Sequence, residues 1–203
     1  MIVIALQLSV CSPSSTDTPT SVSLNTDSFS SQTIVITKVK KPWYAWRSLV
    51  AGKMKKSFPE YQAIDGLDEK FYCFTEHHNL FGGVYFWKTR AQAEAWFTES
   101  WFARTEKTYG LRGIAEYFQI EKIETLRESK ETEVSFWAAL TYATSTDLVS
   151  AKGLLKIVTL RNEKSQQCVL TFWQNKESAV TYFAKQKKEA EYFDVPLHLI
   201  NVK

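Results

Sequence analysis

The sequence contains one segment twice, and this repetition constrains the fold more than any other feature. Residues 81–97 read FGGVYFWKTRAQAEAWF, and residues 167–183 read QCVLTFWQNKESAVTYF. The apolar and polar positions follow the same pattern at a constant offset, so that Phe86-Trp87 corresponds to Phe172-Trp173. A repeated pattern of this length indicates that the chain builds the same structural unit twice.

The first unit is expected over residues 33–125. Its strands are recognised by β-branched and aromatic runs, and its helices by apolar residues at helical spacing. Thr89 and Gln92 have the spacing of a capping box, and Gly110 suits a helix end. The expected elements are a strand at 33–39, a helix from Pro42 to the Phe58-Pro59 stop, strands at 70–76 and 84–88 joined by a turn, a helix from Thr89 to Gly110, and a strand at 115–123.

The second unit is expected over residues 133–203 and follows the same order more tersely. Asn175 is an N-cap candidate for its main helix, whose apolar face is expected to continue as far as Phe193. The expected elements are a strand at 134–142, a short helix within 143–152, strands at 155–160 and 168–173, the helix after Asn175, and a strand at 196–202.

The order β-α-β-β-α-β in each unit is that of a ferredoxin-like fold. The hairpin strands are apolar at nearly every position, as in FYCF and VLTFW, whereas a sheet with one solvated face should alternate. Helices would cover one face, so a second sheet must cover the other. The sequence therefore predicts an α+β fold in which two ferredoxin-like repeats pack as an intrachain pseudo-dimeric α+β barrel.

Three stretches carry a resemblance to a known family: GLDEKFYCFTE, FGGVYFWKTRAQAEAWFTESWFARTEKTYG and EYFDVPL. They resemble the dimeric α+β barrel superfamily, and within it the antibiotic-biosynthesis-monooxygenase-like members. The shared residues are Gly82 to Trp87, Ala91 to Phe97, and Tyr109-Gly110, which are mostly core and turn positions. The resemblance implies oxygenation of a small aromatic substrate without metal or flavin, or degradation of haem. The pocket trio of the haem-degrading branch has no matching positions in this sequence.

Residues 1–32 differ from the rest of the chain. The segment MIVIALQLSVC is apolar up to Val10 and too short to span a membrane, and a Ser/Thr-rich tether follows. The order of apolar run, Cys11 and tether resembles a bacterial lipoprotein signal in which the cysteine is lipidated. No basic residue precedes Ile2, and Val10 stands where that signal has a small residue. We expect an exported lipoprotein attached to the membrane only through Cys11, with a cytoplasmic protein as the alternative.

Composition excludes several classes of protein. The net charge is only +3, and basic runs are interleaved with acids, which disfavours a nucleic-acid partner. The three cysteines have no zinc-site spacing, so Cys73 and Cys168 are expected to be buried free thiols, with a single bridge as the alternative. No P-loop, GxGxxG, GxSxG or HExxH motif is present, which disfavours nucleotide enzymes and hydrolases.

The catalytic candidates are His77, His78 and Trp87. A histidine at the mouth of the barrel can act as a general base or a haem ligand. Adjacent strand residues point to opposite faces, so the two histidines cannot easily ligate one ion, and we predict no metal site. The alternative is a polar hairpin loop at 77–78 and an ordinary core tryptophan at 87. His198, between two leucines, is expected to be a hydrogen-bonded structural residue.

The substrate-binding candidates are Tyr72, Phe74, Tyr85 and Trp46. Aromatic residues of the hairpin would suit a flat apolar ligand held in the barrel or between the sheet and its helices, although they would equally form a core. Three hypotheses follow: a cofactor-independent monooxygenase-like enzyme for a small apolar aromatic molecule, a non-catalytic binding module for a hydrophobic ligand such as haem, or a filled structural barrel. The protein is expected to act as a monomeric pseudo-dimer or a homodimer.

Overall fold

The computed structural model describes residues 31–43, 45–76, 79–127, 135–142 and 151–201. Strands and helices alternate along this part of the chain. In chain order they are β1 Thr33–Lys40, α1 Arg47–Lys56, α2 Phe58–Gln62, β2 Leu67–Thr75, β3 Leu80–Trp87, α3 Arg90–Trp96, α4 Glu99–Tyr109, β4 Ile114–Thr125, β5 Phe136–Thr141, β6 Leu154–Asn162, β7 Gln167–Trp173, α5 Lys176–Lys185 and β8 Glu191–Ile200.

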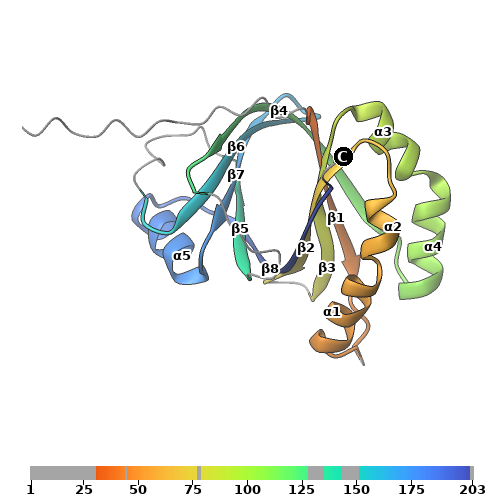
Figure 1. Ribbon diagram of the computed structural model, residues 1–203. Helices are drawn as coiled ribbons and strands as arrows, with labels where there is room; N and C mark the ends of the chain where they lie inside the picture. Colours follow the sequence, from red (N-terminus) through yellow and green to blue (C-terminus); the bar gives the residue numbers. More distant parts are fainter. Residues whose placement is uncertain (1–30, 44, 77–78, 128–134, 143–150, 202–203) are drawn as a thin grey trace, which may run out of the picture.

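The eight strands form one closed antiparallel barrel in the order β1-β3-β2-β8-β5-β7-β6-β4 (Figure 1). Helices α1 to α4 cover the outer face of β1, β2 and β3, and α5 lies on the opposite side of the barrel. The α+β class and the barrel are therefore confirmed. The strands are apolar on both sides because one side faces the barrel interior and the other faces the helices.

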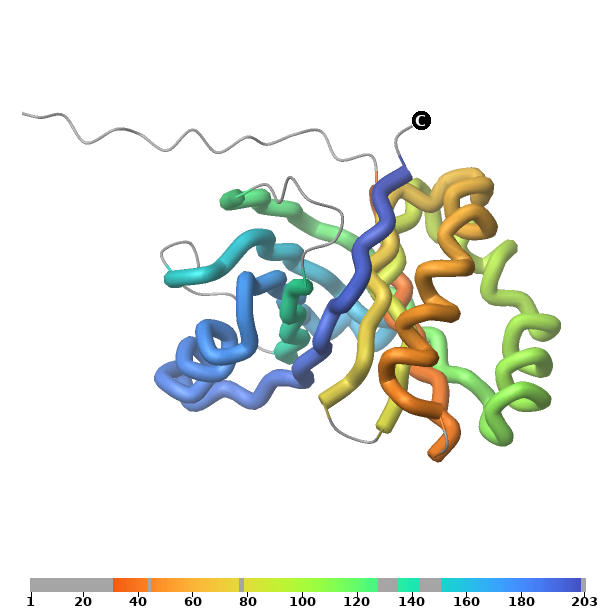
Figure 2. The backbone as a smooth tube through the Cα atoms, turned by 60° about the horizontal axis from the view of Figure 1, so that its bottom comes forward, coloured from red at the N-terminus to blue at the C-terminus, as the bar shows by residue number. Residues whose placement is uncertain are grey.

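Side chains from both halves of the chain fill the barrel. Phe71 and Phe172, which come from different halves, have ring centroids 4.3 Å apart. Figure 2 shows how the last strand, β8, runs beside β2 and joins the two halves. Cys73 and Cys168 belong to this core as free thiols, as expected, and burial raises the pKa of Cys73 to about 12. The interior is thus a packed core of Phe, Leu, Ile and Val side chains.

Both predicted N-caps are confirmed. The Thr89 side chain accepts a hydrogen bond from the backbone N–H of Gln92, and Asn175 accepts one from Ser178. Each cap supplies an acceptor for an N–H that has no partner within its helix.

Several expected boundaries were wrong. The helix expected from Pro42 to the Phe58-Pro59 stop begins at Arg47 as α1, and Phe58 begins the separate helix α2. Strand β3 begins at Leu80, so Gly82 lies within the strand rather than in a turn; a Cβ at Gly82 would lie only 1.9 Å from the backbone oxygen of Thr37. The helix expected from Thr89 to Gly110 is divided, because Phe97 leaves helical geometry, Thr98 is extended and α4 begins at Glu99. The apolar spacing is compatible with one continuous stripe, so only the backbone geometry shows the break.

Another error concerns the end of the chain. Helix α5 stops at Lys185, and Phe193 lies in β8, where it packs in the barrel interior. Phe193 and Val195 follow the two-residue period of a strand, although Phe193 also fits the helical spacing that predicts a longer helix. The short helix expected within 143–152 lies largely outside the described residues.

Two ionic clusters lie near the two ends of the barrel. At one end, Lys38 Nζ is 2.7 Å from Glu191 and 2.9 Å from Glu116. At the other end is a cluster of Glu69, Lys156 and His198. In this cluster Lys156 Nζ donates to both Glu69 carboxylate oxygens at 3.0 and 3.1 Å, and His198 Nε2 lies 3.0 Å from Glu69 Oε2.

The structural role expected for His198 is confirmed. Its ring stacks on Phe71, with centroids 4.0 Å apart, and its Nε2 contacts the Glu69 carboxylate. Both partners belong to β2, so the hydrogen bond and the stacking tie β8 to its neighbouring strand.

A pair of glycines provides a test of backbone conformation. Gly110 has φ +79° and Gly52 lies within α1, and a Cβ at either position would meet nothing within 4 Å. Gly110→Ala is expected to lower the free energy of unfolding by about 1 kcal/mol, because alanine is disfavoured in left-handed conformation. Gly52→Ala is expected to raise it by about 0.5–1 kcal/mol through helix propensity. Urea unfolding of both variants measures these changes in the free energy of unfolding, and changes of the same sign would contradict the prediction.

Candidate functional site

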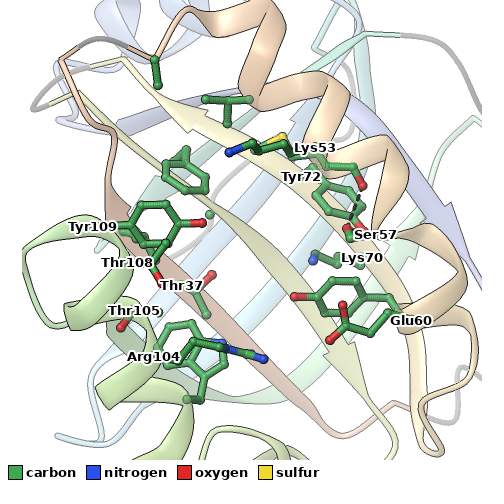
Figure 3. A pocket seen from close by; sticks show the side chains of 18 of the residues that line it. Thr37, Lys53, Ser57, Glu60, Lys70, Tyr72, Arg104, Thr105, Thr108 and Tyr109 are labelled. Atoms are coloured by element: carbon green, nitrogen blue, oxygen red, sulfur yellow. Dashed lines mark hydrogen bonds between the residues drawn. The ribbon is translucent and has the colours of Figure 1, made fainter.

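A cleft of about 330 Å³ lies outside the barrel, between the outer face of the first half and the helices that cover it (Figure 3). Strands β1, β2 and β3 form its floor, with α1 and α2 on one side and α4 on the other. The aromatic residues of its lining are Tyr61, Tyr72, Phe81, Tyr85, Trp101 and Tyr109.

The alternation of strand side chains decides which residues reach this cleft. In β2, Glu69 and Phe71 belong to the barrel interior, so Lys70 and Tyr72 point to the outer face. In β3, Tyr85 points to the same outer face. Strand β2 thus turns Glu69 and Phe71 to the barrel and Lys70 and Tyr72 to the cleft.

Lys70 is the most unusual residue of the cleft, because it is a lysine that is only 3% exposed. Its Nζ lies over three tyrosine rings, at 3.0 Å from the centroid of Tyr61, 3.8 Å from Tyr72 and 4.7 Å from Tyr85. No carboxylate in the described part of the chain forms an ion pair with it. Burial lowers the pKa of Lys70 well below its usual range, and the Glu60 carboxylate opposes this shift in part.

The three tyrosines pack against one another with their ring faces towards Lys70. The Tyr72 hydroxyl lies 3.0 Å from Ser57 Oγ, and the rings of Tyr61 and Tyr85 contact each other with centroids 5.9 Å apart. Burial raises the pKa of all three tyrosines, most strongly that of Tyr85. The rings therefore stay neutral at physiological pH and form a cage of π-faces around the amine.

The rim of the cleft is charged and exposed. Glu60 on α2, Lys53 on α1 and Arg104 on α4 line it, and all three are exposed to solvent. Leu49, which is 51% exposed, lies on the same rim. A ligand would therefore meet polar groups at the entrance and aromatic rings with one amine at the floor (Figure 3).

The residues selected from sequence divide into those that line the cleft and those that do not. Tyr72 and Tyr85 line it. Phe74 packs beneath α1, with the Arg47 guanidinium 4.2 Å from its ring centroid, and Trp46 is 80% exposed at the start of α1; neither is among the lining residues. Trp87 is fully buried in the core beneath α3, also outside the lining.

Three further candidates, His77, His78 and Cys11, lie outside the described residues. Their expected roles therefore stay predictions.

Lys70 and Tyr61 are among the cleft residues that the sequence analysis missed. Lys70 stands at the start of the expected strand 70–76, where a lysine commonly lies at a solvated edge. The period of two does put Lys70 on the same face as Tyr72, and that is the signal that could have found it. Tyr61 follows Pro59, which was expected to stop a helix, although Pro59 in fact lies in the first turn of α2.

Neither a metal cluster nor a membrane span is found in the described ranges. Among their residues, no group of three or more His, Cys, Asp and Glu side chains is placed to hold a metal ion. Within the same ranges, no helix is long and apolar enough to cross a membrane.

Solved structures with the same fold match the chain at low sequence identity. An anthrone oxidase-like protein matches with a TM-score of 0.57 and 10% identity, covering 85% of this chain and 94% of its own. A putative monooxygenase from Fusobacterium nucleatum matches with a TM-score of 0.59 and 7% identity, over 85% and 95% of the two chains. A protein of the same description from Lactobacillus acidophilus gives 0.56 and 10%, over 84% and 97%. No family model and no curated protein matches the sequence.

The chain is therefore an eight-stranded α+β barrel protein with a monooxygenase-like fold. The matched structures are covered over nearly their whole length, so the likeness extends to both halves of the barrel. Because a shared fold supports many functions, the site has to supply the argument for activity.

Proposed function

We propose that this protein binds a small aromatic molecule in the cleft between the first half of the barrel and its helices, and oxygenates it without metal or flavin. The observation that carries the proposal is the cleft itself, whose volume of about 330 Å³ is lined by tyrosines and contains one buried amine. Ligand sites typically combine apolar and aromatic walls with a few placed polar groups. Oxygen would be the co-substrate.

The packed barrel interior and the separate outer cleft together distinguish this proposal from a purely structural barrel. In the described part of the chain, packed phenylalanine and leucine side chains occupy the barrel, and a barrel without a small-molecule role would need only that core. The additional cleft on the outer face favours a ligand. A non-catalytic binding module, with haem as one candidate ligand, is the alternative because the cleft serves binding as well as turnover.

We also propose that the two halves are ferredoxin-like repeats. Around the barrel, each half contributes its fourth, first, third and second strand in that order, and the halves meet at β2-β8 and β6-β4. The registers agree as well. Trp87 pairs with Leu67 and Phe86 with Glu69 across a bulge, while Trp173 pairs with Leu154 and Phe172 with Lys156 across a bulge. Since the barrel closes within one chain, a monomeric pseudo-dimer is sufficient to complete the barrel without a second subunit.

Oxygen turnover distinguishes the enzyme from the binding module. Anthrone is a suitable first probe, because one matched structure is an anthrone oxidase-like protein. Purified full-length chain with anthrone should consume oxygen faster than anthrone in buffer. Binding of anthrone or haem with no oxygen uptake would support the binding module instead.

Blocking the cleft is expected to abolish ligand binding. Thr108 lies on α4 at the exposed edge of the cleft, so Thr108→Trp would place a large side chain at the entrance. We expect at least about a tenfold loss of affinity for 2-naphthamide, a neutral aromatic probe, measured by isothermal titration calorimetry.

Ala103→Trp is the matched control, because Ala103 is exposed on the same helix but does not line the cleft. Equal affinities in the two variants would place the ligand elsewhere.

A further inference from the structure

The buried amine of Lys70 has a cation-binding environment but no anion. Its Nζ lies against three tyrosine ring faces, and ring faces attract a cation without neutralising its charge. A buried lysine without a carboxylate partner is strongly disfavoured in its charged form. The protein carries this cost at the floor of its cleft, where a ligand would arrive.

We propose that the ligand of this cleft is an aromatic molecule with an ionisable oxygen, a carboxylate, phenol or enol, whose anion pairs with Lys70 Nζ. This inference rests on the proposed function, because it requires the cleft to bind an aromatic molecule. The ligand ring would lie among Tyr61, Tyr72 and Tyr85, and its oxygen would complete the coordination of the amine.

The described lining of the cleft places no carboxylate in ion-pair contact with the amine. Glu60 is the acidic residue of the lining, but it lies on the exposed rim and forms no ion pair with Lys70. The tyrosine hydroxyls supply no anion either, because burial raises the pKa of all three and keeps them neutral. An acidic phenol or enol could transfer its proton to the neutral amine on binding, so that no proton enters or leaves solution. A carboxylate that is already ionised would instead draw a proton from solvent.

Lys70→Met gives the direct test with an isosteric pair of probes, 2-naphthoate and neutral 2-naphthamide. In the wild-type protein we expect 2-naphthoate to bind at least about ten times more tightly. In Lys70→Met this preference should fall to within about twofold; a tenfold preference corresponds to roughly 1.4 kcal/mol. Methionine fills the same space without charge, so the affinity for 2-naphthamide should change little.

Two further variants locate the anion. Lys53→Met and Arg104→Met each remove an exposed cation from the rim. Both should retain most of the preference for 2-naphthoate. A preference that survives Lys70→Met but is lost in Arg104→Met would overturn the proposal and place the anion at the rim.

A measurement on the wild-type protein keeps the proposal testable if Lys70→Met does not fold. Burial lowers the pKa of Lys70 in the unliganded protein, and a bound anion would raise it. At pH values above the unliganded pKa, binding of 2-naphthoate should therefore be accompanied by uptake of a proton by Lys70. Calorimetry in buffers of different ionisation enthalpy detects this uptake, and affinity should fall as pH rises. The other titratable groups of the cleft are Lys53, Glu60, Tyr61, Tyr72, Tyr85, Arg104 and Tyr109.

The outcomes separate this inference from the proposed function. If 2-naphthamide binds and 2-naphthoate binds no better and without proton uptake, the inference is wrong and the aromatic cleft survives. If neither probe binds, the proposed function fails and the inference fails with it.

Discussion

Lys156→Met is expected to lower the free energy of unfolding by about 3 kcal/mol, because it leaves the Glu69 carboxylate buried without its main partner. The Glu69 side chain is 8% exposed and that of Lys156 is 14% exposed, so solvent can replace little of the lost interaction. His198 retains one hydrogen bond to Glu69, which places the expected loss at the lower end of the range for broken buried pairs. Urea unfolding monitored by tryptophan fluorescence measures the loss.

The double variant Glu69→Leu/Lys156→Met is the control for this cluster. Removing both charges leaves no unpaired ion, so it should recover most of the stability lost in the single variant. A double variant as unstable as Lys156→Met would show that packing, rather than the charge, controls the effect.

The loss of folding stability at acidic pH gives a second measurement of the interactions of Glu69. Burial raises the pKa of Glu69, but Lys156 and His198 outweigh burial, and the net pKa is lowered. A lowered folded-state pKa contributes stability that is fully present above the unfolded pKa of about 4.3 and is lost as pH falls through the folded value. We expect Lys156→Met to weaken this loss between about pH 5 and pH 3, because Glu69 then no longer has a strongly lowered pKa.

The Glu69–Lys156 ion pair also shows an advantage of building the barrel from two halves with different sequences. Glu69 and Lys156 occupy corresponding register positions, opposite Phe86 and Phe172 in their own halves. In a barrel made from two identical chains, these positions would hold two like groups, which repel each other if charged. A single chain can place opposite charges there and so close the barrel with an ion pair.

Trp87→Ala is expected to lower the free energy of unfolding by about 3–5 kcal/mol, the usual cost of truncating a buried tryptophan. Trp87 is fully buried and contacts Phe97 and Tyr85, with ring centroids at 6.1 and 6.5 Å. Thermal unfolding and urea titration measure the loss. Because many domains have only about 5–15 kcal/mol of stability, lost activity in this variant would reflect partial unfolding as much as chemistry.

Trp87→Phe is the variant that tests a functional role. The Trp87 indole N–H has no hydrogen-bond acceptor in the described part of the structure, whereas that of Trp173 donates to Thr171 Oγ1 at 2.8 Å. Trp173→Phe should therefore cost about 1 kcal/mol more than Trp87→Phe. Trp87→Phe should also bind 2-naphthamide as tightly as the wild type. A folded Trp87→Phe protein without turnover would restore Trp87 as a catalytic candidate.

Short-range periodicity, together with the repetition of one segment at a constant offset, was sufficient to predict the α+β class and the barrel. Spacing within a few residues was enough to predict the two hairpins and their burial on both faces, and also the helix caps at Thr89 and Asn175. The hairpins are the strand pairs 70–76 with 84–88 and 155–160 with 168–173. The same patterns failed at Phe97 and Phe193, where helical and extended spacing are both compatible with the same apolar residues.

The division of the aromatic residues between cleft and core depends instead on tertiary packing. Tyr85 and Trp87 point to the same face of β3, yet the packing of α3 buries Trp87 and the separation of α1 from α4 leaves Tyr85 at the cleft floor. The same applies to Lys70, whose burial depends on α2 bringing Tyr61 over β2. The free energy of a buried charge is set by what packs against it across long sequence distances, and local sequence does not contain those contacts.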